Sequence, residues 1–304
     1  MKRYHMVIFS AALALLAYAP SSAWSAGGPC VASIDECPIQ GCSSSPSAQA
    51  PFDRYLNEKK NRDANQIPPD HLRPLNVDDA LNPRVLPTHS PSSGNPKDLR
   101  EAWLSNDPAA QSVLAMENHQ TAVIGYILRA KPGDGESCNC DLTDRNVVDT
   151  HINLIQDVDT QADPRDLLYR SMIVEVTHRI RNSAWTVRAL NAISLTSGKT
   201  TPRVRIIGAL TYDNSHWDML RQGTRGTLWE VHPITEIDVE VNGTFKPFTA
   251  RSAQTVFSLV RRGPNQPLLL STGSNVQFTN AMRARWTPEQ IQALDQRMEE
   301  DDRS

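Results

Sequence analysis

The chain has 304 residues, 39% of them hydrophobic, and its 21 prolines outnumber its 14 glycines. This composition allows one domain of ordinary size with long irregular segments, or at most two small domains, and it excludes several large cores. The formal net charge of −3 does not indicate a globally basic nucleic-acid-binding protein.

Residues 1–23 have the layout of a secretory signal peptide. Lys2 and Arg3 precede an apolar run that is too short for a comfortable membrane span, and small residues precede the expected cut after Ala23. A cut after Ala26 and an uncleaved N-terminal anchor are the alternatives. Removal of Lys2 and Arg3 with the signal peptide leaves 29 of the 31 basic residues against 34 acidic ones, so the net charge of the mature chain is −5.

No later stretch approaches the ~20 apolar residues of a membrane helix, so we predict a secreted or periplasmic protein without a membrane span after signal removal.

All five cysteines fall into two groups, near the start of the mature chain and in a turn rich in Gly and Asp: Cys30, Cys37, Cys42, Cys138 and Cys140. Outside the cytosol such cysteines usually form disulfides, and a bridge between the two groups would fix the N-terminal arm to the rest of the protein. The odd number leaves one cysteine unpaired. Zinc bound by cysteines is the alternative, although the spacings match no standard zinc module.

Residues 24–118 are predicted to form a largely irregular arm rich in Cys and Pro. Seven prolines between 67 and 97 exclude long helices and central strands, so this part is expected to be extended or wrapped over another part of the molecule. Short helices are predicted over 52–63 and 96–104, and neither segment can form its own core.

From residue 121 onward, short apolar segments show the period of two that is typical of β-strands. In the second and third segments, polar residues such as His151 and Glu175 alternate with apolar ones such as Ile152 and Val174, which predicts an antiparallel sheet with one solvated face. In the fifth, Pro233 predicts a bulge. The predicted strands cover 121–130, 147–156, 171–178, 203–213 and 227–241, and a helix over 182–193 separates the third from the fourth.

The order of three strands, one helix and two strands resembles the OB-fold, a small Greek-key barrel. The resemblance implies a mainly β, five-stranded OB-like barrel over 119–245, with one helix between the third and fourth strands. A β-sandwich or an SH3-like barrel is the alternative. The segment from Trp229 to Pro233 is also similar to one in uncharacterised exported bacterial proteins, which implies a grouping but no activity.

Residues 246–304 are predicted to form an extension that ends in a helix. Thr287 is suited to cap this helix, Pro288 to open it and Gln290 to complete the capping box, and an apolar stripe follows at helical spacing. We expect this helix to pack against the domain.

Imidazoles and carboxylates lie on the polar faces of the second, third and fifth predicted strands and in the loop before the fifth: His151, Glu175, His216, Glu230 and His232, with Asp149 beside them. Such residues are the usual ligands of Zn²⁺, Mn²⁺ or Ni²⁺, and a metal there could activate water for hydrolysis. No compact motif such as His-Glu-x-x-His is present. The alternative is structural: Glu230 and His232 would make polar contacts with Arg205 or Arg225 across the sheet.

Seven basic residues and only one acidic residue lie between residues 170 and 205. OB-folds commonly bind nucleic acids or oligosaccharides across their strand face, with basic groups along a backbone and aromatic rings stacked on bases or sugars. The candidate ligand-binding residues are therefore Arg179, Arg181, Arg205 and Trp217. A solvated basic face, offset by acidic residues elsewhere, is the alternative.

No nucleotide-binding glycine motif and no nucleophile motif is present, so no cofactor is implied apart from a divalent metal ion. The sequence favours an exported binding module over an enzyme. The identity of its ligand is unknown, and an anionic polymer or a glycan is the ligand class that the basic residues suggest. A metal-dependent hydrolase of the phosphodiesterase or nuclease kind is the alternative, and a structural envelope protein is the third hypothesis.

Overall fold

The computed structural model of the protein describes residues 30–43, 53–67, 73–88, 108–117, 119–158, 162–195 and 201–249. The predicted signal peptide, the helix predicted over 96–104 and the predicted C-terminal helix lie outside these described residues.

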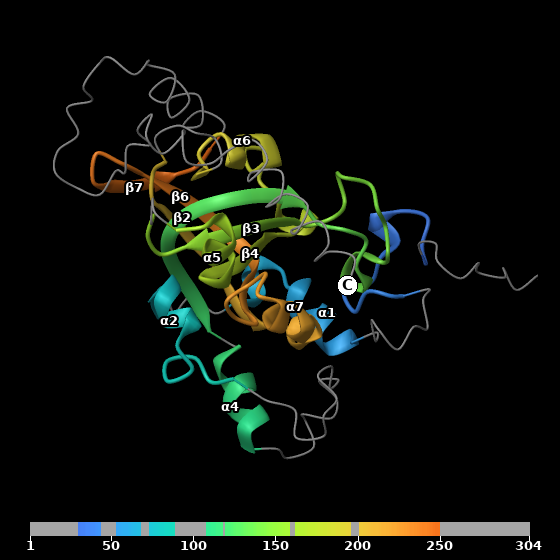
Figure 1. Ribbon diagram of the computed structural model, residues 1–304. Coiled ribbons are helices and arrows are strands. Elements are labelled where there is room, and N and C mark those ends of the chain that lie inside the picture. Colours follow the sequence, from blue (N-terminus) through green and yellow to red (C-terminus); the bar gives the residue numbers. More distant parts are fainter. Residues whose placement is uncertain are drawn as a thin grey trace, which may run out of the picture.

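Five strands form a closed mixed β-barrel (Figure 1): β2 (Gln120–Pro132), β3 (Thr150–Ile155), β4 (Ser171–Val176), β5 (Val204–Tyr212) and β6 (Trp229–Val241). The order is β2-β3-β4-β6-β5, and β5 pairs again with β2 to close the barrel. β4 and β6 are parallel, whereas the other neighbours are antiparallel. The mainly β class and the five-stranded barrel are therefore confirmed, and the strand order is compatible with an OB-like barrel.

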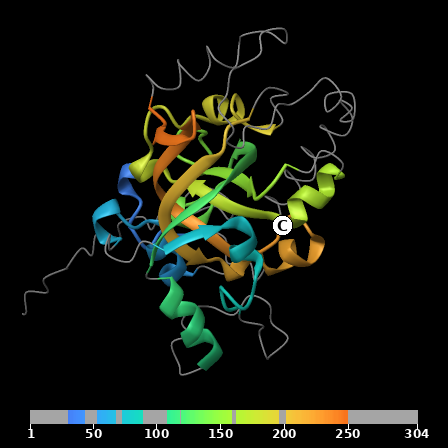
Figure 2. The same cartoon turned by 90° about the vertical axis from the view of Figure 1, so that its left-hand side faces the viewer.

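Two short strands extend the sheet. β7 (Thr244–Pro247) pairs with the end of β6, and β1 (Arg73–Asn76) pairs in parallel with β2. β1 lies within the arm that was predicted to be largely irregular, and it tolerates Pro74 because it is at the edge of the described sheet. β1 and the following helix are shown in cyan in Figure 2, in front of the barrel strands.

The described α-helices are short and lie between the strands: α1 (Arg54–Lys60), α2 (Val77–Leu81), α4 (Pro108–Met116), α5 (Pro164–Tyr169), α6 (Val187–Asn191) and α7 (Trp217–Gln222). α6 confirms the helix predicted between the third and fourth barrel strands, although it is shorter than predicted because Thr186 caps it by accepting a hydrogen bond from the Ala189 amide. α7 ends at Gly223, which adopts the left-handed conformation that glycine favours.

The apolar faces of all five barrel strands form one core. Ile152 on β3 lies opposite Val174 on β4, which lies opposite Val231 on β6, and Val231 lies opposite Leu210 on β5. All four are fully buried in the same cluster. Burial of each such side chain contributes about 1.5–3 kcal/mol, so the alternating apolar residues determine which strand face becomes the barrel interior.

The β5–β6 pair is irregular near the proline, as the sequence predicted. The register shifts on both sides of Gly208, which lies opposite Ile234. A Cβ atom at Gly208 would lie 2.3 Å from the carbonyl oxygen of Pro233. Only glycine therefore allows the two strands to approach this closely at the bulge.

The polar face of β3 and β4 is not solvated, and this part of the prediction is wrong. All six residues of each strand are buried. The N-terminal arm covers this face and is held there by the Cys37–Cys140 disulfide, whose partners are 103 residues apart, and by hydrogen bonds such as that from Asn61 Nδ2 to the Cys138 carbonyl oxygen (2.8 Å). Because this contact is formed between distant segments, the alternation within the strands could not reveal it.

Candidate metal centre

Neighbouring strands bring imidazoles and a carboxylate together on the polar face. His151 on β3 lies opposite Glu175 on β4 in the antiparallel register, and His232 reaches the same carboxylate from β6. The Glu175 Oε2 atom is 2.9 Å from His232 Nδ1 and 3.5 Å from His151 Nε2. One carboxylate oxygen therefore faces both imidazoles.

Two further carboxylates complete this group, which we call the carboxylate-imidazole cluster (Glu136, Asp149, His151, Glu175 and His232). His232 Nε2 is 3.2 Å from Asp149 Oδ2, and His151 Nε2 is 3.3 Å from Glu136 Oε1. These four contacts between an imidazole nitrogen and a carboxylate oxygen run from 2.9 to 3.5 Å. Adjacent ligands of an ion with metal–ligand bonds of about 2.0–2.2 Å have similar separations.

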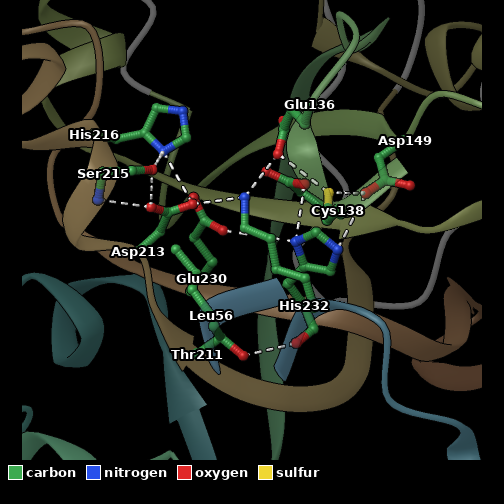
Figure 3. Close-up of polar contacts among 12 residues, drawn as sticks. Leu56, Glu136, Cys138, Asp149, Thr211, Asp213, Ser215, His216, Glu230 and His232 are labelled. Carbon is green, nitrogen blue, oxygen red and sulfur yellow. Dashed lines mark hydrogen bonds and ion pairs between the residues drawn. The ribbon is translucent and has the colours of Figure 1, made fainter. Parts of the chain in front are cut away.

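A second buried group lies beside the first, and we call it the lysine-aspartate cluster (Lys60, Asp213, His216, Arg225 and Glu230). Lys60 Nζ is 2.7 Å from Asp213 Oδ2, and Arg225 Nη2 is 2.6 Å from Glu230 Oε1. His216 Nδ1 is 3.0 Å from Asp213 Oδ2. In Figure 3, Asp213, His216 and Glu230 lie on the left, and Asp149 lies on the right beyond His232.

The two clusters are connected and almost closed to solvent. Lys60 Nζ is also 2.9 Å from Glu136 Oε2, and Glu230 Oε2 is 3.8 Å from His232 Nδ1. The side chains of Lys60, Glu230 and His232 are at most 3% exposed, whereas those of Glu136 and His216 are 22% and 18% exposed. Solvent therefore reaches the clusters at their rim, beside Glu136 and His216.

The buried charges shift one another's pKa values. Burial alone would raise the pKa of Asp149 and of Glu175, but hydrogen bonding and charge from His232, and the charge of His151 near Glu175, hold both below their ordinary values. Burial disfavours the charged form of His232, yet Glu175 and then Asp149 raise its pKa well above the ordinary value. The fold is therefore stabilised by an imidazolium at His232, between two carboxylates.

In the lysine-aspartate cluster the pKa of Asp213 is well below its ordinary value, because the charges of His216 and Lys60 outweigh the opposing effect of burial. The pKa of Lys60 is well above its ordinary value, since Asp213 and Glu136 outweigh the desolvation of the ammonium group. Lys60 therefore remains charged in the buried site.

The two clusters differ in charge balance. In the lysine-aspartate cluster, two carboxylates face Lys60 and Arg225. In the other cluster, Glu136 forms an ion pair with Lys60, whereas the ion-pair partners of Asp149 and Glu175 among the described residues are imidazoles. Arg181 lies near enough to Asp149 to interact with its charge at longer range. The remaining positive charge must come from protons on the imidazoles or from a bound cation.

The structure brings together four of the five predicted metal ligands, His151, Glu175, Glu230 and His232, and places His216 beside them through Asp213. It also shows the structural contact that was the alternative for Glu230, an ion pair with Arg225.

Lys60, Glu136 and Asp213 were missed by the sequence reasoning. The spacing of three residues between Asp213 and His216 is a weak local signal that the two side chains interact. No local pattern marks Lys60 or Glu136.

The predicted ligand-binding residues take part in intramolecular contacts. Arg179 and Arg181 lie in and directly after one short 3-10 helix, apart from Arg205 and Trp217 in the sequence. Arg179 donates to the Asn61 side chain and to the Cys37 carbonyl oxygen, which helps to hold the arm. Arg181 donates to the Val148 carbonyl oxygen. Arg205 on β5 forms an ion pair with Asp238 on β6, and Trp217 at the start of α7 packs, partly buried, against the core.

The cysteines form the predicted bridge between arm and barrel. Cys37 pairs with Cys140, Cys30 pairs with Cys42, and Cys138 has a free, buried thiol. The pairing of four cysteines agrees with the disulfide interpretation of their spacing. Burial, followed by the charges of Glu136 and Asp149, raises the pKa of the Cys138 thiol well above its ordinary value.

None of the helices that the structure describes is long and apolar enough to cross a lipid bilayer. Comparison with known proteins gave no match: no family model matches the chain, and no significantly similar curated protein or solved structure was found.

Proposed function

We propose that the carboxylate-imidazole cluster binds one divalent metal ion, such as Zn²⁺ or Mn²⁺, and that the ion activates water for hydrolysis. The charge imbalance carries this proposal: the buried Asp149 and Glu175 and the partly exposed Glu136 have one lysine beside them, which contacts Glu136 and also neutralises Asp213. An uncompensated buried carboxylate costs on the order of several kcal/mol. One divalent ion with neutral imidazoles supplies the missing charge without any imidazole proton.

The donor atoms support the same proposal. Two overlapping sets, each with one imidazole and two carboxylates, have ligand atoms within 4.8 Å of one another: Glu136, His151 and Glu175, and Asp149, Glu175 and His232. Imidazoles and carboxylates are usual ligands for these metals. Glu175 Oε2 faces both imidazoles, and Asp149 Oδ1 has no hydrogen-bond partner among the described residues. An ion at this position would satisfy lone pairs that the protein itself leaves without partners.

The proposed reaction follows from what such an ion does. A bound divalent metal lowers the pKa of its water to about 7 in favourable sites, which generates hydroxide near neutral pH. Substrate would approach at the exposed rim beside Glu136 and His216. Lys60 and Arg181 are cations close to the site, so we infer an anionic substrate such as a phosphodiester.

Metal analysis tests the proposal. The protein is purified without chelator, and the metal content of wild type, Glu175→Gln and Glu240→Gln is measured by mass spectrometry. Glu240 is a matched control because it is a buried carboxylate on the same barrel whose ion pair with Arg203 lies outside the cluster. We expect about one metal ion per chain in wild type and control, and loss in Glu175→Gln. Equal metal content in all three folded proteins would refute the site.

An exported binding module without catalysis is the second candidate, and the OB-like strand order favours it. The internal contacts of Arg179 and Arg205 leave it with less support than the metal site. Salt-sensitive binding of an anionic polymer that is lost in Arg205→Ala would support it. If neither metal nor polymer binds, a structural envelope protein remains.

We also propose export to the periplasm or the extracellular space, with removal of residues 1–23. The support is the pair of disulfides, since such bridges persist in oxidising compartments. Determination of the N-terminal residue of the mature protein from a cell fraction tests this.

A further inference from the structure

The five side chains of the carboxylate-imidazole cluster cannot all bind the same ion. Two ligands of one ion with bonds of about 2.0–2.2 Å are at most about 4.4 Å apart. Among the described residues, the ligand atoms within 4.8 Å of one another form two sets in this cluster, which we call the rim set (Glu136, His151 and Glu175) and the inner set (Asp149, Glu175 and His232). Neither set contains both imidazoles. In Figure 3, the side chain of Cys138 lies between Glu136 and Asp149, which belong to different sets.

Glu175 belongs to both sets and lies between the two imidazoles. Its Oε2 atom is 3.5 Å from His151 Nε2 and 2.9 Å from His232 Nδ1. The Glu175 side chain is only 1% exposed, and this oxygen accepts no well-aligned hydrogen bond from the described residues. A carboxylate has about four lone-pair sites on its two oxygens, so it can bind two cations at once. Glu175 is therefore placed to bridge two ions.

The two sets differ in their access to solvent. The Glu136 side chain in the rim set is 22% exposed, so water can supply the remaining ligands of an ion there. The inner set is closed, because the side chains of Asp149 and His232 are 3% and 0% exposed. The rim set should therefore bind an ion more readily, and the inner set should fill only when more metal is supplied.

We propose that the cluster is a two-metal centre, in which the rim set holds the ion proposed above, the inner set holds a second divalent ion and Glu175 bridges the two. The inference rests on the proposed metal site. When the second ion binds, the lone pair of a His232 ring nitrogen forms the metal–nitrogen bond, and any proton that this nitrogen carries leaves to buffer. No oxidation or reduction takes place. Protein purified without added metal or phosphate keeps the first ion only.

A two-metal centre indicates phosphoryl esters as the substrate class. In the two-metal sites of phosphatases and nucleases, the ions lie about 3.5–4 Å apart and stabilise the attacking and leaving oxygens of one phosphoryl group. Two divalent ions carry more charge than the three carboxylates of the cluster, so the filled centre needs a further anion. A phosphoryl group supplies this charge. We therefore expect inorganic phosphate and the second metal ion each to strengthen the binding of the other.

Manganese tests the inference, because two bridged Mn²⁺ ions are spin-coupled and give an electron paramagnetic resonance spectrum that isolated Mn²⁺ does not give. The full chain is titrated with Mn²⁺ with and without inorganic phosphate, and the bound metal is counted by mass spectrometry. With phosphate, we expect two ions per chain and the coupled spectrum in wild type. Asp149→Asn changes the inner set only, so we expect one ion and an uncoupled spectrum.

Asp238→Asn is the matched control, because Asp238 is a buried aspartate whose ion pair with Arg205 lies outside the cluster. It should bind two coupled ions, as wild type does. One ion per chain in wild type, or two ions without spin coupling, would overturn the two-metal centre and leave the first metal site intact. Failure to bind any metal would refute the first site and this inference together. If Asp149→Asn does not fold, the wild-type spectrum alone still decides, since the coupling is either present or absent.

Discussion

The two buried clusters are neighbours on the same face of the barrel, but they reach charge balance in different ways. In the lysine-aspartate cluster, Lys60 and Arg225 face two carboxylates, so its charges are permanent. In the carboxylate-imidazole cluster, most of the positive charge must come from His151 and His232 or from an external cation. A buried group with its own fixed cations is structural, whereas one that depends on exchangeable cations is the better candidate for function.

The bridge that holds the arm should have the largest effect on stability. Replacement of Cys37 and Cys140 by alanine removes a cross-link across 103 residues, and the chain-entropy model predicts a loss of about 4–5 kcal/mol. Loss of the Cys30–Cys42 bridge, across 12 residues, should cost roughly 3 kcal/mol or less. Chemical denaturation of both variants measures this, and an equal or reversed order would contradict the role of the arm as a fixed cover.

Removal of the shared lysine should break the balanced cluster. Lys60→Met leaves Asp213 buried without its lysine, and we expect a loss of about 3–5 kcal/mol. The control is Arg203→Met, which breaks a single ion pair whose arginine side chain is 32% exposed; because it leaves the buried Glu240 without that partner, we expect a smaller loss of about 1–3 kcal/mol. Similar losses in the two variants, measured by urea denaturation, would show that Lys60 is not part of a balanced buried cluster.

Metal should stabilise only the unbalanced cluster. At a free Zn²⁺ concentration of 100 times Kd, a single site that is absent from the unfolded chain adds about 2.7 kcal/mol. Calorimetric melting should show an increase in Tm with zinc for wild type and for Glu240→Gln, and none for His151→Ala. An equal increase in His151→Ala would place the metal elsewhere.

The stability of the metal-free protein should fall at both low and high pH. The pKa values of Glu136, Asp149, Glu175 and Asp213 are lowered in the fold, so their contribution is present above roughly pH 4 and is lost as the pH falls through the folded values. The pKa of His232 is raised, so its contribution is present below about pH 6.5 and is lost as the pH rises through its folded value.

Zinc should reduce the alkaline loss of stability without abolishing it, because the ion replaces the imidazole proton of His232 whereas the pKa of His216, which Asp213 raises, is unaffected. Melting curves from pH 3 to 10, with chelator or with zinc, provide the comparison. An alkaline decrease in Tm that is unchanged by zinc would contradict the exchange of proton for metal.

Much of the barrel could be predicted from the sequence because it depends on local alternation. Ile152 and Val174 on one face, with His151 and Glu175 on the other, determine which side of each strand is the core. The bulge follows from Pro233 and needs Gly208 opposite it. These features require only the period of a strand and the chemistry of single residues.

Burial of the site could not be predicted in the same way. It depends on the arm, where Lys60 reaches Asp213 across more than 150 residues and Cys37 reaches Cys140 across 103. Such contacts follow from docking of two surfaces, and no local pattern encodes them. The sequence therefore indicated which polar side chains share a face, but it placed them in solvent, and it missed Lys60 and Glu136.

The most direct measurement is anomalous X-ray diffraction at the zinc edge from crystals grown with Zn²⁺. The account predicts a peak within about 2.0–2.3 Å of ligand atoms from the carboxylate-imidazole cluster, and none within the lysine-aspartate cluster. Full zinc occupancy at surface sites, with no peak among Glu136, His151, Glu175 and His232, would contradict it.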